Sequence, residues 1–336
     1  MLISIIIPVY NLENHIAKCL SSILEQNINS NSFELIVIND NSKDKSLKKI
    51  KKFKKKFNNL SIINNKNNLG PGLSRNKGIY AAKGKYTMFV DGDDFLPENS
   101  LKNIQNFLIK KKYDFIGYNF NKVLSKKKIL KNYRKDFNFI SKNLNLRIKN
   151  FLNGEIDGSV IFSVIKRELI IKNKITFYSG LHEDILFIFK VYFYSKQFAF
   201  IYKPLYLKKN RQGSIVNILN KKRVYDLFKQ SLHIKKFLIS KKIKFKKINK
   251  FYIRGLVGNV GGVLTEILLL KSLEKRKIMY IYIFKIMVKM LKDEKMPDKS
   301  KKDKIVNLFL NTLKAQKNNK DLFKIYEKEV IKLIQL

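Results

Sequence analysis

The chain has 336 residues, of which 45% are hydrophobic and 12% aromatic, and this composition excludes a protein that stays unfolded throughout. Cys19 is its only cysteine, which excludes an internal disulfide and argues against a structural zinc site. The formal net charge of +44 is compatible with nucleic acid, an anionic membrane surface or an acidic substrate as partner, and also with an A/T-rich genome that favours lysine codons.

The first hundred residues alternate between short apolar runs and helical patterns. Strands are predicted at 3–10, 33–38, 60–63 and 86–90, and helices at 13–26, 46–57 and 70–82. This alternation predicts right-handed βαβ units and a mainly parallel sheet, whose ligand crevice lies beyond the carboxyl ends of the strands. Tyr10, Asp40 and the acidic run 91–94 all lie at the carboxyl ends of predicted strands, so we expect them to share one crevice.

The pattern changes along the rest of the chain. It is less regular from 120 to 180, with a strand predicted at 160–164 and a short helix after it. An apolar helix is predicted at 185–194, and lysine-rich helical patterns follow from about residue 217. We therefore expect a catalytic domain at 1–217 and a basic helical region at 218–336.

The sequence favours a cytoplasmic location. The opening MLISIIIPVYN has no basic segment and is interrupted by Pro8, so it does not read as a signal peptide. The two most apolar later stretches, 255–270 and 278–291, contain charged residues, so neither is expected to span a membrane.

The run Asp91-Gly92-Asp93-Asp94 carries the strongest chemical signal. Three carboxylates in four residues repel one another unless a cation or hydrogen bonds compensate. Mg²⁺ and Mn²⁺ prefer oxygen ligands and typically take one or two carboxylates plus substrate phosphate oxygens. A solvated acidic turn is the alternative, because Asp-Gly is a good turn sequence, but the apolar strand directly before it favours a metal site.

The other candidates each have a structural alternative. Asp40 could accept a hydrogen bond from a nucleotide, or it could cap the helix that follows it. Tyr10 could stack on a nucleobase or be buried next to Pro8. Glu183 and Asp184 could supply a general base, or they could simply stabilise the start of a helix through its dipole.

Five stretches in the first 215 residues together resemble the family 2 glycosyltransferases of GT-A fold. They are SIIIPVYN (4–11), ELIVINDNS (34–42), NLGPGLSRNKG (68–78), DGDD (91–94) and LHEDILF (181–187). The resemblance implies an α/β, Rossmann-like fold with a mainly parallel sheet flanked by helices, here with a C-terminal helical extension. It also implies inverting, metal-dependent sugar transfer from a nucleotide-diphosphate donor, with Mn²⁺ or Mg²⁺ as cofactor.

On the donor side, the resemblance assigns roles by position. Pro8 and Tyr10 would line the nucleobase pocket, and Asp40 would read the edge of uracil or an equivalent base. Arg75 and Asn76 would lie near the donor sugar.

The resemblance also assigns the acidic groups. Asp91 would contact the ribose or the sugar, Asp93 would hold the metal, and Asp94 would be a neighbouring ligand or orienting group. Asp184 would be the catalytic base, with Glu183 positioning acceptor or donor. Arg211 belongs to a segment, 206–214, that resembles the loop closing over the donor.

The expected reaction is transfer of a single hexosyl or N-acetylhexosaminyl group, with a UDP-sugar as the expected donor. The chain has no tryptophan, so it lacks the Gln-x-x-Arg-Trp motif of processive synthases. The acceptor would be a glycan or lipid-linked molecule in the synthesis of lipopolysaccharide, lipooligosaccharide, capsule or glycoprotein glycan. The basic C-terminal helices would suit a peripheral position on the inner face of the plasma membrane.

Two other classes remain as alternatives. A nucleotidyltransferase that makes nucleotide-sugars would need a glycine-rich, basic phosphate loop after the first strand, and this chain has Tyr-Asn-Leu-Glu-Asn-His there. A basic nucleic-acid-binding module would need basic and aromatic residues interleaved on one face, which the segment 221–250 permits but does not select. No nucleic-acid partner is expected.

Overall fold

A computed structural model describes residues 1–124, 129–132, 140–209 and 219–244, with separate positions between 252 and 286. The chain divides into two compact units. The first comprises Met1–Phe151 and Glu155–Ile215, and the second comprises Leu152–Gly154 and Val216–Leu336. Arg211, one of the expected site residues, lies outside the described residues.

The first half of the large unit is a parallel sheet, as the sequence predicts. Its strands are β1 (Ile3–Val9), β2 (Phe33–Asn39), β3 (Leu60–Asn64) and β4 (Tyr86–Phe89), in the order β3-β2-β1-β4. Each neighbouring pair is parallel. Every residue of β1 and β2 is buried, which is typical of central strands covered on both faces.

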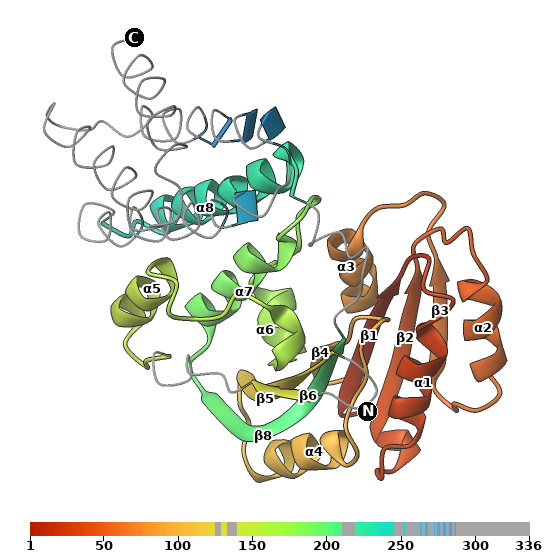
Figure 1. Ribbon diagram of the computed structural model, residues 1–336. Helices are drawn as coiled ribbons and strands as arrows, with labels where there is room; N and C mark the ends of the chain where they lie inside the picture. Colours follow the sequence, from red (N-terminus) through yellow and green to blue (C-terminus); the bar gives the residue numbers. More distant parts are fainter. Residues whose placement is uncertain are drawn as a thin grey trace, which may run out of the picture. The chain divides into compact units, whose positions relative to one another are not determined.

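Three helices cover this half of the sheet (Figure 1). They are α1 (Ile16–Leu24), α2 (Ser46–Phe53) and α3 (Pro71–Ala81), with the short 3₁₀ turn η1 (Ser30–Ser32) before β2. The chain runs from β1 outward to β3 and then returns past β1 to β4, so right-handed crossovers place α1 and α2 on one face and α3 on the other. The carboxyl ends of β1 and β4 therefore form the switch point at which α/β sheets bind ligands.

The second half of the sheet is mixed. Within the described residues it contains β5 (Phe115–Val123), β6 (Ile129–Asn132), β7 (Ser163–Lys166) and β8 (Phe198–Lys209). β7 lies antiparallel between β4 and β5, β6 is antiparallel to β5, and β8 is parallel to β5. The segment 206–214 was expected to be a loop, but 206–209 are the end of β8, and 210–214 lie outside the described residues.

The helices of this half are α4 (Ser100–Lys110), α5 (Leu144–Leu152), α6 (Arg167–Lys172) and α7 (Glu183–Tyr194). The strand predicted at 160–164 begins only at Ser163, because Val160–Phe162 form the 3₁₀ turn η3. The ring of Phe187 on α7 stacks on Phe177 at 3.8 Å and meets Phe89 of β4 edge-on at 5.9 Å. These rings hold α7 against β4, so its first turn lies near the end of that strand.

The described part of the second unit is mainly α8 (Lys221–Ser240). The side chain of Asn220 caps it by accepting a hydrogen bond from the backbone N–H of Arg223 at 2.8 Å. The Arg223 guanidinium pairs with Glu266. Among the described residues we find no helix with the length and apolarity needed to cross a membrane. The helical character of 218–336 as a whole stays a prediction.

Candidate active site

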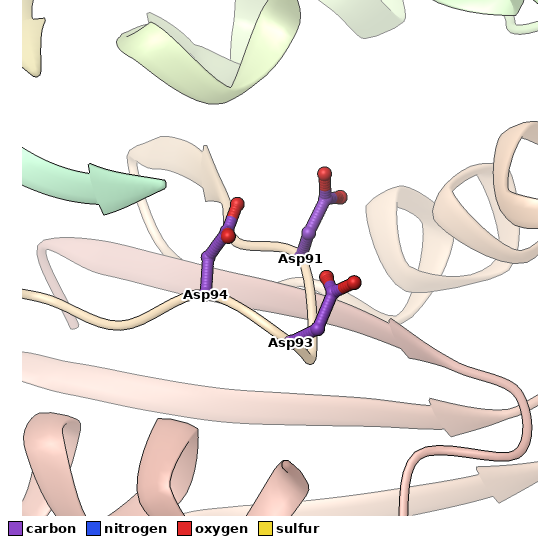
Figure 2. A group of neighbouring side chains, drawn as sticks. All are labelled: Asp91, Asp93 and Asp94. Carbon is purple, nitrogen blue, oxygen red and sulfur yellow. The ribbon is translucent and has the colours of Figure 1, made fainter. Parts of the chain in front are cut away.

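The acidic run 91–94 forms a tight loop directly after β4. The backbone N–H of Asp94 donates to the carbonyl of Asp91 at 3.0 Å, which closes the turn. One carboxylate oxygen from each of Asp91, Asp93 and Asp94 lies within 4.8 Å of the others. Figure 2 shows the three carboxylates projecting from the same side of the loop. The sequence prediction that these side chains gather at one point is therefore met by the geometry.

Asp94 is the buried member of this group, with 3% of its surface exposed. Its Oδ2 accepts a hydrogen bond from the Tyr206 hydroxyl at 2.7 Å, and its Oδ1 accepts one from the backbone N–H of Lys209 at 2.7 Å. Burial, followed by the charges of Asp91 and Asp93, raises the pKa of Asp94 to about 8. The raised pKa means that the loop disfavours a further negative charge on Asp94, and a bound cation would offset this repulsion.

The residues of this loop fit a hard divalent cation, because all three potential ligand atoms are carboxylate oxygens at short mutual distances. They do not contribute equally. Both oxygens of Asp94 already accept hydrogen bonds from residues of β8, and Asp91 Oδ1 accepts one from Arg75 at 2.7 Å. Asp93 is partly exposed. Its expected role as the metal ligand stays a prediction that the geometry accommodates.

Arg75 connects the acidic loop to the start of α7. Its Nη2 donates to Asp91 Oδ1 at 2.7 Å, and its Nη1 donates to Glu183 Oε1 at 2.6 Å. Burial opposes the charge on this guanidinium, but Asp91, Glu183 and Asp184 outweigh it and raise the pKa of Arg75 above its ordinary value. Arg75 was expected to lie near the donor sugar, which stays a prediction. In the structure this side chain bridges two carboxylates. It is buried, with 5% exposed, and holds two carboxylates at a fixed separation.

Glu183 and Asp184 form the first turn of α7, as the sequence predicts. This turn approaches α3 so closely that a Cβ at Gly72 would lie 2.6 Å from Glu183 Cγ, which only glycine tolerates. Glu183 is buried, whereas Asp184 is partly exposed. The acidic pair therefore sits where α3 and α7 meet, beside the end of β4.

Asp184 differs from its neighbours in its contacts. No hydrogen-bond donor in the described part of the chain reaches its carboxylate. Burial raises its pKa to about 7, the negative charges of Glu183, Asp157 and Asp91 act in the same direction, and Arg75 acts against them. A carboxylate is suited to take up a proton when its pKa is near neutrality and its oxygens accept no hydrogen bond from the protein. The role of general base stays a prediction for this residue.

Asp40 anchors the segment before α3. It is 2% exposed, and its carboxylate accepts hydrogen bonds from the backbone N–H groups of Leu69 and Gly70 and from the Asn65 side chain. The sequence alternative placed Asp40 as a cap of the next helix, α2, and that alternative is wrong, because its partners precede α3 instead. Recognition of a base edge by Asp40 stays a prediction.

The remaining donor-side candidates divide into two kinds. Asn76 uses both ends of its amide on the backbone of Phe177, at 2.9 Å each, so it ties α3 to the segment before α7. Its expected place near the donor sugar stays a prediction. Pro8 is buried at the end of β1, whereas Tyr10 is 41% exposed. The alternative that Tyr10 is buried beside Pro8 is therefore wrong, and its ring is accessible to a ligand.

Two residues of the site have no role in the sequence argument. Tyr206 was included only as the start of a loop, yet its hydroxyl contacts both ends of the acidic run. Asp157 lies in a segment that the sequence marks only as turn-rich, yet its charge acts on Asp184. The apolar and aromatic run that begins at 198 would have indicated a strand. Nothing in the sequence near Asp157 indicates its partner.

Comparison with known proteins places this geometry in a family. The family model of glycosyl transferase family 2 matches residues 4–172. The poly(ribitol-phosphate) beta-glucosyltransferase of Bacillus spizizenii is 32% identical over 207 residues, which cover 59% of this chain and 31% of that protein. The poly(ribitol-phosphate) beta-N-acetylglucosaminyltransferase TarS of Staphylococcus aureus is 34% identical over 108 residues, covering 32% and 19%. The matches thus span about a third or less of these relatives.

Solved structures agree with the fold. TarS residues 1–349 in complex with UDP-GlcNAc superpose with a TM-score of 0.59 at 21% identity, covering 84% of this chain and 87% of that one. The mannosyltransferase PcManGT from Pyrobaculum calidifontis, in complex with GDP-Man and Mn²⁺, gives a TM-score of 0.55 at 15% identity, covering 87% and 88%. The predicted GT-A fold, an α/β architecture with a mostly parallel sheet flanked by helices, is confirmed.

Proposed function

The chain belongs to glycosyl transferase family 2, and on that premise we propose that it transfers a hexosyl or N-acetylhexosaminyl group from a nucleotide-diphosphate sugar to a cell-surface glycan. The proposed donor is a UDP-sugar, in line with the UDP-GlcNAc bound by TarS. The proposed acceptor is a glycan, glycopolymer or lipid-linked saccharide. The polymers in the names of the relatives support that class.

The proposed reaction is a single displacement at the anomeric carbon. The acceptor oxygen forms a bond to that carbon, and the bond to the diphosphate oxygen breaks, so the nucleoside diphosphate leaves with the electron pair and the configuration inverts. The acceptor proton passes to a carboxylate oxygen of Asp184. A divalent cation bound at Asp93 would supply charge neutralisation for the leaving diphosphate.

The observation that carries this proposal is the arrangement around Arg75. Asp91 on the donor side and Glu183 on the other side bind the same buried guanidinium at 2.7 and 2.6 Å. Asp184, which follows Glu183 in the helix, therefore has a fixed position relative to the acidic loop. A nucleotide-sugar held at the loop would present its anomeric carbon towards a base on α7.

A screen of nucleotide-sugars tests the proposal. Purified protein is incubated with UDP-, GDP- and TDP-sugars, with Mn²⁺, Mg²⁺ or EDTA, and release of the nucleoside diphosphate is measured. We expect metal-dependent hydrolysis of one UDP-sugar in the absence of acceptor, and no effect of added RNA. Loss of that activity on adding RNA would favour the nucleic-acid-binding alternative, and release of pyrophosphate from UTP and a sugar phosphate would favour the nucleotidyltransferase.

Asp93→Ala is the informative variant in this screen. It removes the partly exposed carboxylate of the acidic loop, so donor affinity in the presence of Mn²⁺ should fall on the order of 10–100-fold. Donor affinity in EDTA should be unchanged. Glu168→Gln, an exposed acid paired with Lys166 on the surface, provides the matched control. Equal donor affinity of Asp93→Ala and wild type in Mn²⁺ would remove Asp93 as the ligand.

We also propose that the second unit associates with an anionic membrane surface on the cytoplasmic side. The support is the exposed face of α8, where Lys221, Lys222 and Lys236 lie with Tyr225 and Ile239, both about half exposed. Interleaved lysines and apolar groups are typical of helices that rest in the membrane interface.

Vesicle flotation tests this proposal. Protein should float with vesicles that contain anionic lipid at low salt, and remain at the bottom with neutral vesicles or at high salt. Reversal of Lys221, Lys222 and Lys236 to glutamate should abolish flotation. The same reversal of three exposed lysines on and after α4, Lys110, Lys111 and Lys112, should not. Flotation that survives the α8 reversal would reject this surface.

A further inference from the structure

Tyr206 lies where the end of β8 meets the acidic loop, and its side chain is fully buried. Its hydroxyl accepts a hydrogen bond from the backbone N–H of Asp91 at 3.1 Å and donates one to Asp94 Oδ2 at 2.7 Å. A single oxygen atom therefore joins the backbone at the start of the loop to a carboxylate at its end.

The end of β8 makes further contacts with the same loop. The backbone N–H of Lys209 donates to Asp94 Oδ1 at 2.7 Å. Leu207 and Phe95 exchange two backbone hydrogen bonds, at 2.9 and 3.2 Å. Both oxygens of Asp94 are thus held by donors from β8, and the residue after Asp94 is held by the β8 backbone. Figure 2 shows the arrowhead of this strand beside Asp94.

The ring of Tyr206 is itself supported by the core rather than by the loop. It meets the ring of Phe162 edge-on, with centroids 5.5 Å apart at 87°. Phe162 in turn stacks on Phe120 of β5, with centroids 3.8 Å apart at 5°. The hydroxyl is therefore held by a packed aromatic column that contains no residue of 91–94.

We propose that Tyr206 is a positioning residue that sets the spacing of the three acidic-loop carboxylates and so the affinity of the loop for a divalent cation. This inference rests on the proposed function, since it assigns Tyr206 to the metal-dependent step of that reaction. Removal of the hydroxyl would leave the Asp91 N–H without its acceptor and Asp94 with one donor. The loop would then have more freedom, and the three oxygens would converge less often on one point.

The test compares two tyrosine variants. Tyr206→Phe removes the proposed contact. Tyr118→Phe is the matched control, because Tyr118 is also fully buried and its hydroxyl donates to the carbonyl of Ile161 at 2.8 Å, away from the loop. Each change deletes one buried hydroxyl, so each should lower the melting temperature, by about 2–6 °C.

Binding of Mn²⁺, alone and with UDP, is measured by the electron paramagnetic resonance of the free ion. Tyr206→Phe should raise the dissociation constant of Mn²⁺ about 10-fold, as expected for loss of a hydrogen bond to a ligand group, and Tyr118→Phe less than about 2-fold. In transfer assays the Mn²⁺ concentration for half-maximal rate should rise in parallel, while kcat at saturating Mn²⁺ stays within about 3-fold. Phe162→Leu, which keeps the hydroxyl but weakens its support, should give an intermediate shift.

The outcomes separate the two proposals. Wild-type protein that binds Mn²⁺ with UDP but transfers no sugar would defeat the proposed function and leave the positioning role of Tyr206 in place. Equal Mn²⁺ affinity of Tyr206→Phe and Tyr118→Phe would overturn the positioning role, as would a wild-type protein that binds no Mn²⁺ with or without UDP. Should Tyr206→Phe fail to fold, unchanged Mn²⁺ affinity of Phe162→Leu would overturn it as well.

Discussion

The acidic loop after β4 and the acidic first turn of α7 each contain an aspartate whose pKa is raised far above its usual range, but the two differ in the hydrogen bonds that they accept. Asp94 has a donor on each oxygen, both from β8. Asp184 receives no hydrogen bond from the described part of the chain. Burial is the first cause of the shift in both. A raised pKa alone therefore does not identify a catalytic carboxyl group. The hydrogen bonds that the carboxylate accepts distinguish one that holds the fold together from one that is available for chemistry.

Arg75 makes the two regions one site. Its guanidinium pairs with Asp91 of the acidic loop and with Glu183 of the first turn of α7. Its charge also lowers the pKa of Asp184, against the carboxylates that raise it. Four changes test the difference between the two regions: removing the carboxylate of Asp184, removing that of Asp94, removing the Arg75 bridge, and removing the charge of Asp157.

The largest effect is expected for Asp184→Asn. Asparagine keeps the shape of the side chain but cannot take up the proton of the acceptor hydroxyl. The kcat should therefore fall by about 10²–10⁴-fold, as is typical of a lost general base. Donor affinity in Mn²⁺, measured by calorimetry, should stay within about 2-fold, because Asp184 does not hold the acidic loop.

Asp94→Asn is the sharpest contrast to this variant. The amide cannot accept from both Tyr206 and Lys209, so donor and Mn²⁺ affinity should fall together with the melting temperature. Should Asp184→Asn lose donor binding while Asp94→Asn retains it, the distinction between the two regions would be reversed.

Arg75→Met is expected to have the next largest effect, on folding. It leaves the buried Glu183 and the partly exposed Asp91 without their common partner, and breaking a buried ion pair such as Arg75–Glu183 typically costs about 3–5 kcal/mol. Urea unfolding measures the loss of stability. The double variant Arg75→Met with Glu183→Met should recover part of it, because one unpaired carboxylate is removed. A loss below about 1 kcal/mol for Arg75→Met would mean that the bridge is not a structural element.

Much of this site could be predicted from the sequence, for a physical reason. The residues that follow parallel strands, such as Asp40 and Asp93, come to one edge of the sheet by topology alone. Side-chain partnerships were not predictable in the same way. Arg75 and Glu183 are 108 positions apart and meet only because α3 and α7 pack through Gly72.

The role of β8 was missed for a related reason. Tyr206 lies 112 positions from Asp94, and its partner is set by the mixed half of the sheet. The local pattern of residues 198–209 indicates a strand, but it does not indicate the neighbour of that strand. Parallel pairing of β5 with β8 includes two register shifts, so no simple alternation fixes which residue faces the loop.

The smallest effect is expected for Asp157→Asn, and it tests the cause of the Asp184 shift. A general base acts only when ionised, so the rate should rise with pH through a pKa of about 7 and then level off. The charge of Asp157 raises that pKa, so its removal should move the rising limb to lower pH, by less than about one unit. Arg75→Lys should leave the limb nearly in place, because it keeps the positive charge. The dependence of kcat on pH from 5 to 9 measures both. A limb that moves to higher pH in Asp157→Asn would show that the rate does not report the ionisation of Asp184.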